Sequence, residues 1–293
     1  MTLSIIIVHY KNPELLKLCL KSIQNCLAGK NLDYETLVAD SQAESETEAM
    51  LAEEFPQTRY FPFQKNIGYA AGVNCGIQNS AGRYLLILNP DIVVTKDAIP
   101  KMLTQLQKNP EVGLLGPRLL GFNGETQNSR FLFYRPATIA YRRTFLGKSF
   151  FGQKELSKFN LDHNHLDNKS PTEPTYPDWI MGSAILTSRS AIEKVGPMDE
   201  RFFLYFEDVD WARRFWENGF KVMYFPEAVM MHYHQRSSKA GFDFFDFFLR
   251  RETRWHIASA LKYFLKHGWR YKSGEELYKG STLNLKKSRT LVL

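Results

Sequence analysis

The first 116 residues alternate between short apolar runs and longer segments whose apolar positions recur at helical spacing. Residues 3–8 (LSIIIV) and 83–88 (RYLLIL) are almost continuously apolar. A run without polar alternation is typical of a strand buried on both faces, as in a parallel sheet. This alternation predicts an α/β fold in which a doubly wound, mostly parallel sheet carries helices on both faces. Further strands are predicted at 34–39, 60–61 and 112–116, and helices at 14–28, 44–55 and 97–108. Residues 66–79 are predicted to be a glycine-containing loop that runs into a helix.

The second half of the chain has a weaker pattern. Residues 117–175 are polar and lack a clear period, which predicts irregular structure with a mobile loop at 162–174. Ordered structure is expected to return at 176–187. Beyond it we predict helices at 190–195 and 206–218, and apolar strands at 220–225 and 228–232.

Polar residues follow the predicted strands at the edge of the sheet where α/β proteins bind ligands, beyond the carboxyl ends of the strands. His9, Asp40, Asn66 and Asp91 hold such positions. An Asp directly after a buried strand can hold a divalent cation that neutralises a diphosphate. An Asn-Pro-Asp sequence is also a good turn in which the Asp caps the next helix. Both interpretations of Asp91 stay open at this point.

An acidic cluster opens the predicted helix at 206–218. Glu207, Asp208 and Asp210 lie within four residues and repel one another. The helix dipole explains one acidic residue at a helix start, so the cluster invites a second explanation. On a helix, Glu207 and Asp210 share a face while Asp208 points elsewhere, which suggests two roles. A carboxylate aimed into a cleft there could act as a general base.

Two further segments are candidates for chemistry. The glycines of residues 66–76 (NIGYAAGVNCG) permit either close approach to a ligand or tight helix packing. The segment is neither a nucleotide-binding GxGxxG in context nor a GxxxxGK[ST] loop, which counts against a nicotinamide cofactor and against a P-loop ATPase. His232 ends the last apolar run. Histidine is a common metal ligand, although a lone histidine is more often structural.

Composition narrows the class of protein. The chain has 293 residues, of which 44% are hydrophobic and 24% charged, and this excludes disorder, collagen and coiled coil as whole-chain structures. The start reads as a strand and not as a secretion signal, and no apolar run approaches the length of a membrane span. Three cysteines without a spacing pattern indicate neither a disulfide framework nor a zinc site. We therefore expect a cytoplasmic protein.

The positive charge is concentrated at the C-terminus. Residues 250–293 hold eleven Lys or Arg and three Glu, and a Phe-rich run at 242–248 precedes them. Aromatic residues beside basic ones are typical of a helix on an anionic membrane surface. The alternatives are a solvated helix face and packing of the Phe residues against the catalytic domain. We expect no nucleic-acid partner, because the tail carries no recognised nucleic-acid-binding motif.

Seven motifs occur along the chain in this order: SIIIVHYKN, VADS, KNIGYAAGVNCG, LLILNPD, WIMGSA, FLYFEDVDWARRFWENG and PEAVMMHYHQRSS. Taken together, they resemble the family-2 glycosyltransferases of the GT-A fold over roughly residues 2–240. Four features depart from the family pattern: Ser41 replaces an Asn, Tyr69 replaces a Phe, Asn89 replaces an Asp, and the Gly-Gly that usually follows the family histidine is missing after His232.

The resemblance implies roles for particular residues. It implies an inverting transfer in which Asp208, beside Glu207, is the catalytic base. Asp91 and His232 would hold Mg²⁺ or Mn²⁺ at the diphosphate. The implied donor-binding residues are His9, Asp40, Lys65, Asn66, Gly68, Asn89 and Asp91. The residues implied near the acceptor or sugar are Trp179, Gly182, Ser183 and Asp210.

The Asn-Pro-Asp version of the metal motif and the segment RWHIASALKYFLK look most like bacterial rhamnosyltransferases of O-antigen or other cell-wall polysaccharide assembly. The resemblance therefore implies dTDP-L-rhamnose as donor and a saccharide acceptor, lipid-linked at the cytoplasmic face of the inner membrane. A UDP- or GDP-sugar is the alternative donor. A nucleotidyltransferase and a non-catalytic sugar-nucleotide binding module are the alternative functions.

This interpretation divides the chain into a GT-A domain at 1–240 and an aromatic, basic helical extension at 241–293. The GT-A domain would have a nucleotide-binding half at 1–116 and an acceptor half at 117–240. Residues 150–175 would form a lid over the donor, as mobile loops do in other transferases.

Overall fold

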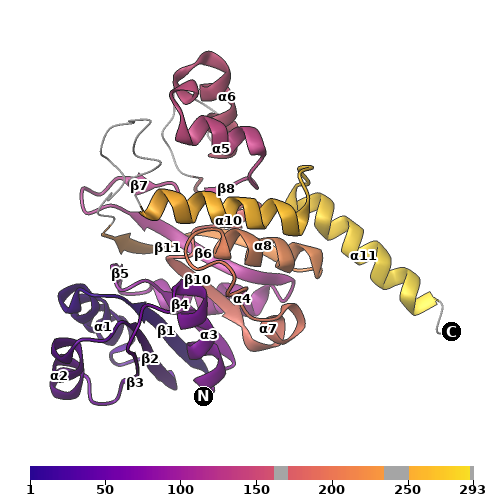
Figure 1. The fold of residues 1–293 in the computed structure, drawn as a ribbon. Helices are drawn as coiled ribbons and strands as arrows, with labels where there is room; N and C mark the ends of the chain where they lie inside the picture. The colour runs from indigo at the N-terminus through magenta and orange to yellow at the C-terminus, as the bar shows by residue number, and fades with distance from the viewer. Residues whose placement is uncertain (162–170, 234–250, 291–293) are drawn as a thin grey trace.

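The computed structural model of the chain describes residues 1–161, 171–233 and 251–290. A single large sheet, in the order β3-β2-β1-β4-β10-β6-β11-β5 with β7 beside β6, lies at its centre (Figure 1). A small second sheet pairs β8 (Arg130–Phe131) with β9 (Trp179–Ile180). The strands of the large sheet are β1 (Leu3–His9), β2 (Tyr34–Ser41), β3 (Arg59–Phe63), β4 (Tyr84–Leu88), β5 (Ile92–Val94), β6 (Val112–Leu120), β7 (Thr126–Gln127), β10 (Ala184–Ser188) and β11 (Lys221–His232).

The predicted α/β class is confirmed, and the N-terminal half of the sheet is parallel, as is the β6–β11 pair. Strands β3, β2, β1 and β4 run parallel to one another, whereas β10 lies antiparallel between β4 and β6. The two strands predicted at 220–225 and 228–232 form one strand, β11, with a register shift between Phe225 and Val229. Pairing of β11 with β5 was not predicted, because β5 has only three residues.

Helices cover both faces of the sheet, and β1 shows why. Leu3, Ile5 and Ile7 face one apolar cluster, and Ile6 and Val8 face the other. Alternate residues of a strand point to opposite faces, so a strand between two helical layers needs apolar residues on both faces. The first face carries α1 (Pro13–Leu27), α2 (Ser45–Glu54) and α4 (Ala98–Lys108), and the second carries α3 (Tyr69–Asn79), α7 (Arg189–Val195) and α8 (Glu207–Glu217).

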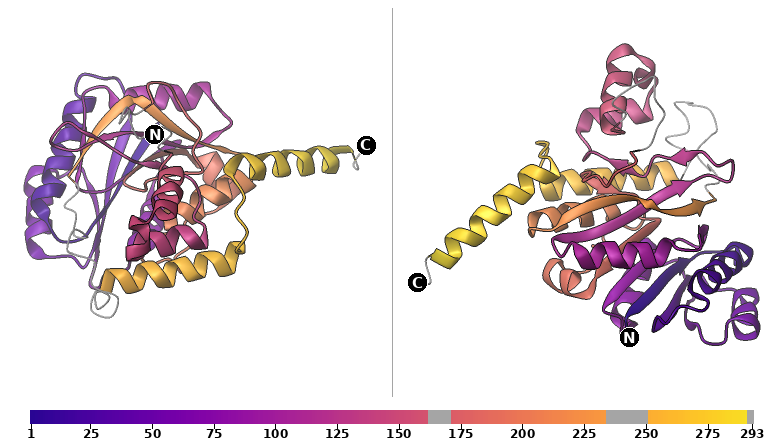
Figure 2. Two further views of the ribbon diagram at one scale, coloured as in Figure 1. Left: turned by 90° about the horizontal axis from the view of Figure 1, so that it is seen from above. Right: turned by 180° about the vertical axis from the view of Figure 1, so that it is seen from behind.

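The prediction that residues 117–175 are irregular was wrong. The segment contains α5 (Pro136–Arg143), a 3₁₀ turn η1 (Phe145–Lys148) and α6 (Phe150–Phe159), which form a lobe that projects from the body (Figures 1 and 2). We call residues 136–159 the α5–α6 lobe. Its apolar residues are largely exposed, so the helical periodicity of buried positions was absent from the sequence. Of the predicted lid, residues 150–159 are helix, and residues 162–170, which make up most of the predicted mobile loop, lie outside the described residues.

The C-terminal helices are α10 (Arg251–His267) and α11 (Gly274–Thr290). Helix α10 places Ala260, Tyr263 and Phe264 in the same apolar cluster as α8. The boundary predicted at residue 240 therefore does not separate two independent cores. The far end of α11 extends away from the body, as both views in Figure 2 show. The Phe-rich run at 242–248 lies outside the described residues.

None of the helices in the described residues combines sufficient length with sufficient hydropathy to cross a bilayer.

Candidate active site

The parallel strands β1 and β2 end side by side, and their last residues form a buried polar pair. His9 and Asp40 are register partners, and His9 Nδ1 lies 2.8 Å from Asp40 Oδ1. The Tyr60 hydroxyl, from β3, donates to Asp40 Oδ2 at 2.8 Å. His9 Nε2 is buried and has no hydrogen-bond partner within the described residues. A buried polar atom of this kind needs a partner, and at this sheet edge a ligand can supply one.

Ser41 connects the end of β2 to the glycine segment. Its hydroxyl donates to Asn66 Oδ1 at 3.0 Å and accepts from the N–H of Ile67 at 2.9 Å. Asn66 Oδ1 also accepts from the N–H of Gly68 at 2.9 Å. The structure therefore brings Asn66 and Gly68 to the edge where Asp40 lies. Lys65 has an exposed side chain that contacts no polar group in the described chain.

Gly68 allows α3 to begin against the loop that precedes α8. It has a φ of 82°, and a Cβ there would lie 2.6 Å from the carbonyl oxygen of Phe203. The N–H of Tyr69 donates to that same oxygen at 3.0 Å. A side chain at position 68 would be strained in conformation and would clash with backbone. The glycine thus joins the donor edge to the acidic cluster.

Asp91 and His232 meet because β5 pairs with β11. Ile92 is the register partner of His232, and Asp91 Oδ2 lies 3.4 Å from His232 Nε2. Asp91 Oδ1 is buried without a hydrogen-bond partner in the described part of the chain. Asn89, two residues earlier, donates its N–H to the carbonyl of Ser183 at 2.9 Å. That bond joins the metal motif to the predicted acceptor segment.

Gln127 sets the orientation of the His232 ring. Its amide nitrogen donates to the His232 carbonyl at 3.0 Å, so its Oε1 faces His232 Nδ1 at 2.8 Å. In the neutral ring Nδ1 therefore carries the proton, and Nε2 presents a lone pair towards Asp91. A divalent cation would be bound by both the Nε2 lone pair and the carboxylate that it faces. The pair supplies two ligands, and no group of three metal-ligating side chains occurs among the described residues.

Glu207 and Asp208 begin α8 directly after two residues with left-handed backbone, Tyr205 (φ 66°) and Phe206 (φ 69°). Non-glycine residues rarely adopt this conformation, and such strain is concentrated at functional sites. Asp208 Oδ2 accepts from the N–H of Gly182 at 3.0 Å, and its Oδ1 accepts from the N–H of Val209 at 2.9 Å. The carboxylate is therefore fixed against the predicted acceptor segment.

Burial changes the proton affinity of both carboxyls. It raises the pKa of Asp208 to about 6, against an ordinary value of 3.8, even though two N–H donors favour the ionised form. Burial and the charge of Asp208 raise the pKa of Glu207 well above its usual range. Glu207 Oε2 has no hydrogen-bond partner among the residues described. A base is most effective when its pKa is near the working pH, and Asp208 meets that condition.

Tyr69 lies near both Asp91 and the Glu207–Asp208 pair. Its hydroxyl donates to the carbonyl of Gly182 at 2.6 Å. Burial raises the pKa of Tyr69, and the charges of Glu207, Asp208 and Asp91 raise it further. The candidate metal residue and the candidate base therefore both act electrostatically on this one hydroxyl.

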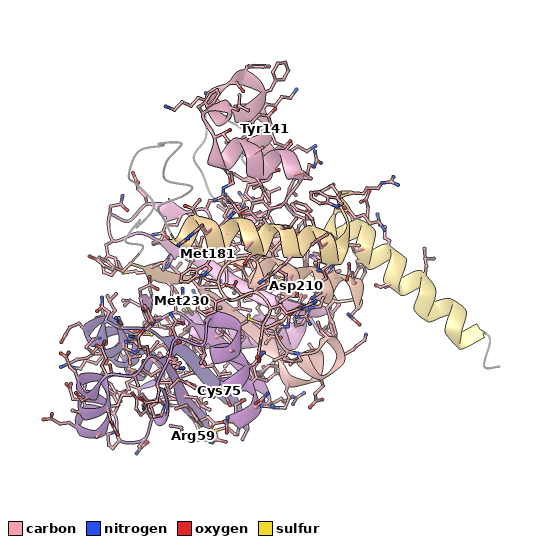
Figure 3. The ribbon with its side chains drawn as sticks, in the orientation of Figure 1. Arg59, Cys75, Tyr141, Met181, Asp210 and Met230 are labelled. Carbon is pink, nitrogen blue, oxygen red and sulfur yellow. The ribbon has the colours of Figure 1, made fainter. Side chains whose placement is uncertain are left out.

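The structure does not bring Asp210 to this site. Its carboxylate is fully buried and pairs with Arg214 of α8 at 2.9 Å, and with Lys266 and His267 of α10 at 2.7 Å each. Burial opposes ionisation, but the hydrogen bond from His267 and the charges of Arg214 and Lys266 lower the pKa of Asp210 overall. Asp210 joins α8 to α10, as its position in Figure 3 illustrates. The acceptor role predicted for it is corrected to a structural one.

Two other predicted acceptor residues have different surroundings. Trp179 is buried, stacks on Phe131 at 4.5 Å between ring centres, and donates its indole N–H to the Leu132 carbonyl. It is a core residue of the small sheet and does not line the site. Ser183 is buried beside Gly182, and its hydroxyl has no hydrogen-bond partner in the described regions.

Tyr60 and Gln127 hold the side chains of site residues, and neither was predicted from the sequence. Tyr60 is the register partner of Val38, which places it beside Asp40 across the β2–β3 pair. That register could have indicated it. Gln127 lies on a two-residue strand, and no local pattern distinguishes such a strand.

The chain was then compared with known proteins. The family model described as "Glycosyl transferase family 2" matches residues 4–166, over half of the chain. The chain belongs to glycosyl transferase family 2. The predicted resemblance is confirmed, and the protein is a glycosyltransferase.

Two relatives bear on the branch of the family. The N-acetylglucosaminyl-diphospho-decaprenol L-rhamnosyltransferase of Mycobacterium tuberculosis is 26% identical over 69% of this chain and 67% of its own length. The rhamnosyltransferase WbbL of Escherichia coli is 24% identical over 61% of each chain. Relatives of this glycosyltransferase thus include rhamnosyltransferases.

A solved structure of GalNAc-T7 with UDP, GalNAc and Mn²⁺ has the same fold, with a TM-score of 0.59 and 15% identity. The alignment covers 80% of this chain and 44% of that one. The predicted GT-A architecture is confirmed by this likeness, and the Mn²⁺ belongs to the neighbour.

Proposed function

We propose that this glycosyltransferase moves L-rhamnose from dTDP-L-rhamnose to a lipid-linked saccharide, with inversion at the anomeric carbon. The observation that carries the proposal is the joining of the Asp91–His232 pair to the Glu207–Asp208 pair through residues 182–183: Asn89 donates its N–H to the Ser183 carbonyl, and Asp208 accepts from the N–H of Gly182. The first pair suits a diphosphate with a divalent cation, and the second suits proton removal from an attacking hydroxyl. The names of two relatives, one of which includes a diphospho-decaprenol, support the donor and the acceptor.

In this mechanism the chain's own residues have four tasks. His9 and Asp40 contact the nucleoside, with Tyr60 holding Asp40 in place. Asp208 takes the proton of the acceptor hydroxyl as that oxygen attacks the anomeric carbon and the bond to the diphosphate breaks. Asp91 faces the departing diphosphate.

Asp91 and His232 fit a Mg²⁺ or Mn²⁺ ion, since Asp91 Oδ2 lies 3.4 Å from His232 Nε2 and the other carboxylate oxygen, Oδ1, is buried without a hydrogen-bond partner among the described residues. Such an ion, when bound, stabilises the negative charge that develops on the leaving diphosphate.

The pH dependence of transfer follows from the raised pKa of Asp208. A general base must be ionised, so we expect kcat/KM to rise about tenfold per pH unit below the pKa and to level off above it. The break should lie near pH 6. Initial rates at low donor concentration between about pH 5 and 8 test this. A flat profile over that range, with the protein folded throughout, would contradict the assignment of Asp208 as the base.

Donor identity is tested by calorimetry with dTDP-L-rhamnose, UDP-sugars and GDP-sugars, each with and without Mn²⁺. We expect selective binding of dTDP-L-rhamnose that Mn²⁺ strengthens. Selective binding of a UDP- or GDP-sugar would reject rhamnose and leave the mechanism intact. Binding of no donor by the folded protein would favour the non-catalytic module. The site shows no support for a nucleotidyltransferase, because residues 9–13 lack a basic glycine-rich loop for a triphosphate.

A further inference from the structure

The α5–α6 lobe carries an unusual concentration of exposed aromatic side chains. Phe145, Phe150 and Phe151 are 76%, 76% and 72% exposed, and Leu146 is 45% exposed. They lie within seven residues of one another, at the junction of η1 and α6. A phenylalanine presents about 150–250 Å², so this junction exposes several hundred Å² of apolar surface. An exposed apolar patch of that size on a soluble protein is usually functional.

The lobe is attached to the body through the C-terminal end of α6. Phe159 is 2% exposed and packs on Phe131 and Tyr134, with ring centres 5.3 and 4.6 Å apart. Thus α6 has one phenylalanine in the core at its base and two at its free end. The lobe stands clear of the body in the right view of Figure 2, and Figure 3 shows Tyr141 within it.

The backbone holds the exposed residues in a fixed turn. A Cβ at Gly147 would lie 2.2 Å from the carbonyl oxygen of Tyr141, and one at Gly152 would lie 2.3 Å from that of Leu146. The Ser149 hydroxyl caps α6 by accepting from the N–H of Gly152 at 3.1 Å. Close backbone packing at these two glycines makes the junction of η1 and α6 a compact tip. The exposed aromatic residues therefore cannot reach the core unless this junction unfolds.

The charge of the lobe identifies what its tip contacts. Residues 136–159 contain five Lys or Arg and one Glu, and Lys148, Lys154 and Lys158 are exposed. The single acid, Glu155, accepts a hydrogen bond from Thr138 at 2.7 Å. Lysine is depleted in protein–protein interfaces, whereas lysine beside exposed aromatic residues is typical of surfaces that dock on anionic bilayers.

We propose that the tip of the α5–α6 lobe, with Phe145, Phe150 and Phe151 inserted and the lysines at the headgroups, docks this protein on an anionic phospholipid membrane. The small sheet connects this surface to the active site. Phe131 of β8 pairs with Trp179 of β9, and Gly182, which binds Asp208, follows three residues later. A lobe docked in this way would present the candidate base to an acceptor held at the membrane surface. The membrane contact itself does not depend on which sugar is transferred.

Flotation of the full chain with vesicles tests the proposal. We compare equimolar phosphatidylglycerol–phosphatidylcholine vesicles with pure phosphatidylcholine vesicles. The wild type should bind the anionic vesicles preferentially, and the Phe145→Ser/Phe150→Ser/Phe151→Ser variant should bind them about tenfold less or weaker still. Since these side chains are exposed, the thermal midpoint should be unchanged. Lys148→Glu/Lys154→Glu keeps the aromatic residues and should also lose binding.

The matched control removes exposed apolar residues elsewhere. Leu261 and Leu265 on α10 are 50% and 70% exposed, and Leu261→Ser/Leu265→Ser should bind vesicles like the wild type. Wild-type protein that fails to float with anionic vesicles overturns the proposal, as does a triple variant that floats as well as the wild type. Loss of binding in the α10 variant alone would also overturn it, and would assign docking to the C-terminal helices. A wild-type dimer that the triple variant dissociates, without vesicle binding, would make the tip a protein contact instead.

Discussion

Asp208→Asn is expected to reduce sugar transfer by about 10²–10⁴-fold while leaving donor binding unchanged. The amide is nearly isosteric with the carboxylate and keeps an oxygen for the N–H of Gly182, but it cannot accept the proton of the acceptor hydroxyl. The donor affinity should not respond, because the proposed donor residues His9, Asp40 and Asp91 keep their side chains and their contacts. Single-turnover transfer measures the first quantity, and calorimetry with the donor measures the second.

The matched control for this substitution is Asp97→Asn. Asp97 is an exposed carboxylate, paired with Lys30 at 2.9 Å just before α4. Its variant should transfer sugar at the wild-type rate. A fully active Asp208→Asn enzyme would reject Asp208 as the base. Loss of donor binding in the same variant would show that α8 supports the donor site instead.

Thermal unfolding separates loss of the base from loss of structure. The folded pKa of Asp208 is raised above its ordinary value, so Asp208 adds stability that is fully present below pH 3.8 and is lost as the pH rises through about 6. Asn does not titrate and escapes this loss. The Tm of Asp208→Asn minus the Tm of the wild type should therefore be most positive at pH 8 and should decrease as the pH is lowered.

Local sequence predicts well those elements in which the pattern of apolar residues matches the burial of each position. Strand β1 is buried at every position and apolar at all but Ser4 and His9, because helices cover both of its faces, and β4 is likewise buried throughout. The α5–α6 lobe gave no such signal, because its tip exposes apolar residues that a periodicity argument expects to be buried. Sequence patterns predict elements through burial, and an element that projects into solvent escapes them.

The same distinction holds at the site. Asp208 lies after a strained turn and beside Gly182, and the base role that the family motif implied for it stays a prediction. Asp210 is only two residues away, but its role depends on His267 and Lys266, which lie more than fifty residues later on α10. No local pattern distinguishes a carboxylate that faces a cleft from one that meets a distant base. That distinction requires the packing of α10 on α8.

Asp91→Asn is expected to weaken Mn²⁺-dependent donor binding and to lower the transfer rate by about 10²–10³-fold, the effect of losing several kcal/mol of charge stabilisation at the diphosphate. The substitution removes the buried oxygen that has no protein partner in the described chain, and it leaves His232 oriented by Gln127. Titration of Mn²⁺ in the presence of dTDP, followed by electron paramagnetic resonance, reports the ion without requiring turnover.

His232→Gln completes the test, because it removes the imidazole lone pair that faces Asp91 while keeping a polar side chain. If both residues hold one cation, the double variant should be little worse than Asp91→Asn alone, since the second change removes a ligand from a site already lost. Additive losses would mean that the two side chains act separately. Equal dTDP affinity in Mn²⁺ and in EDTA for the wild type would instead leave the diphosphate to be bound by Asn89 and the backbone at the end of β4, without a cation.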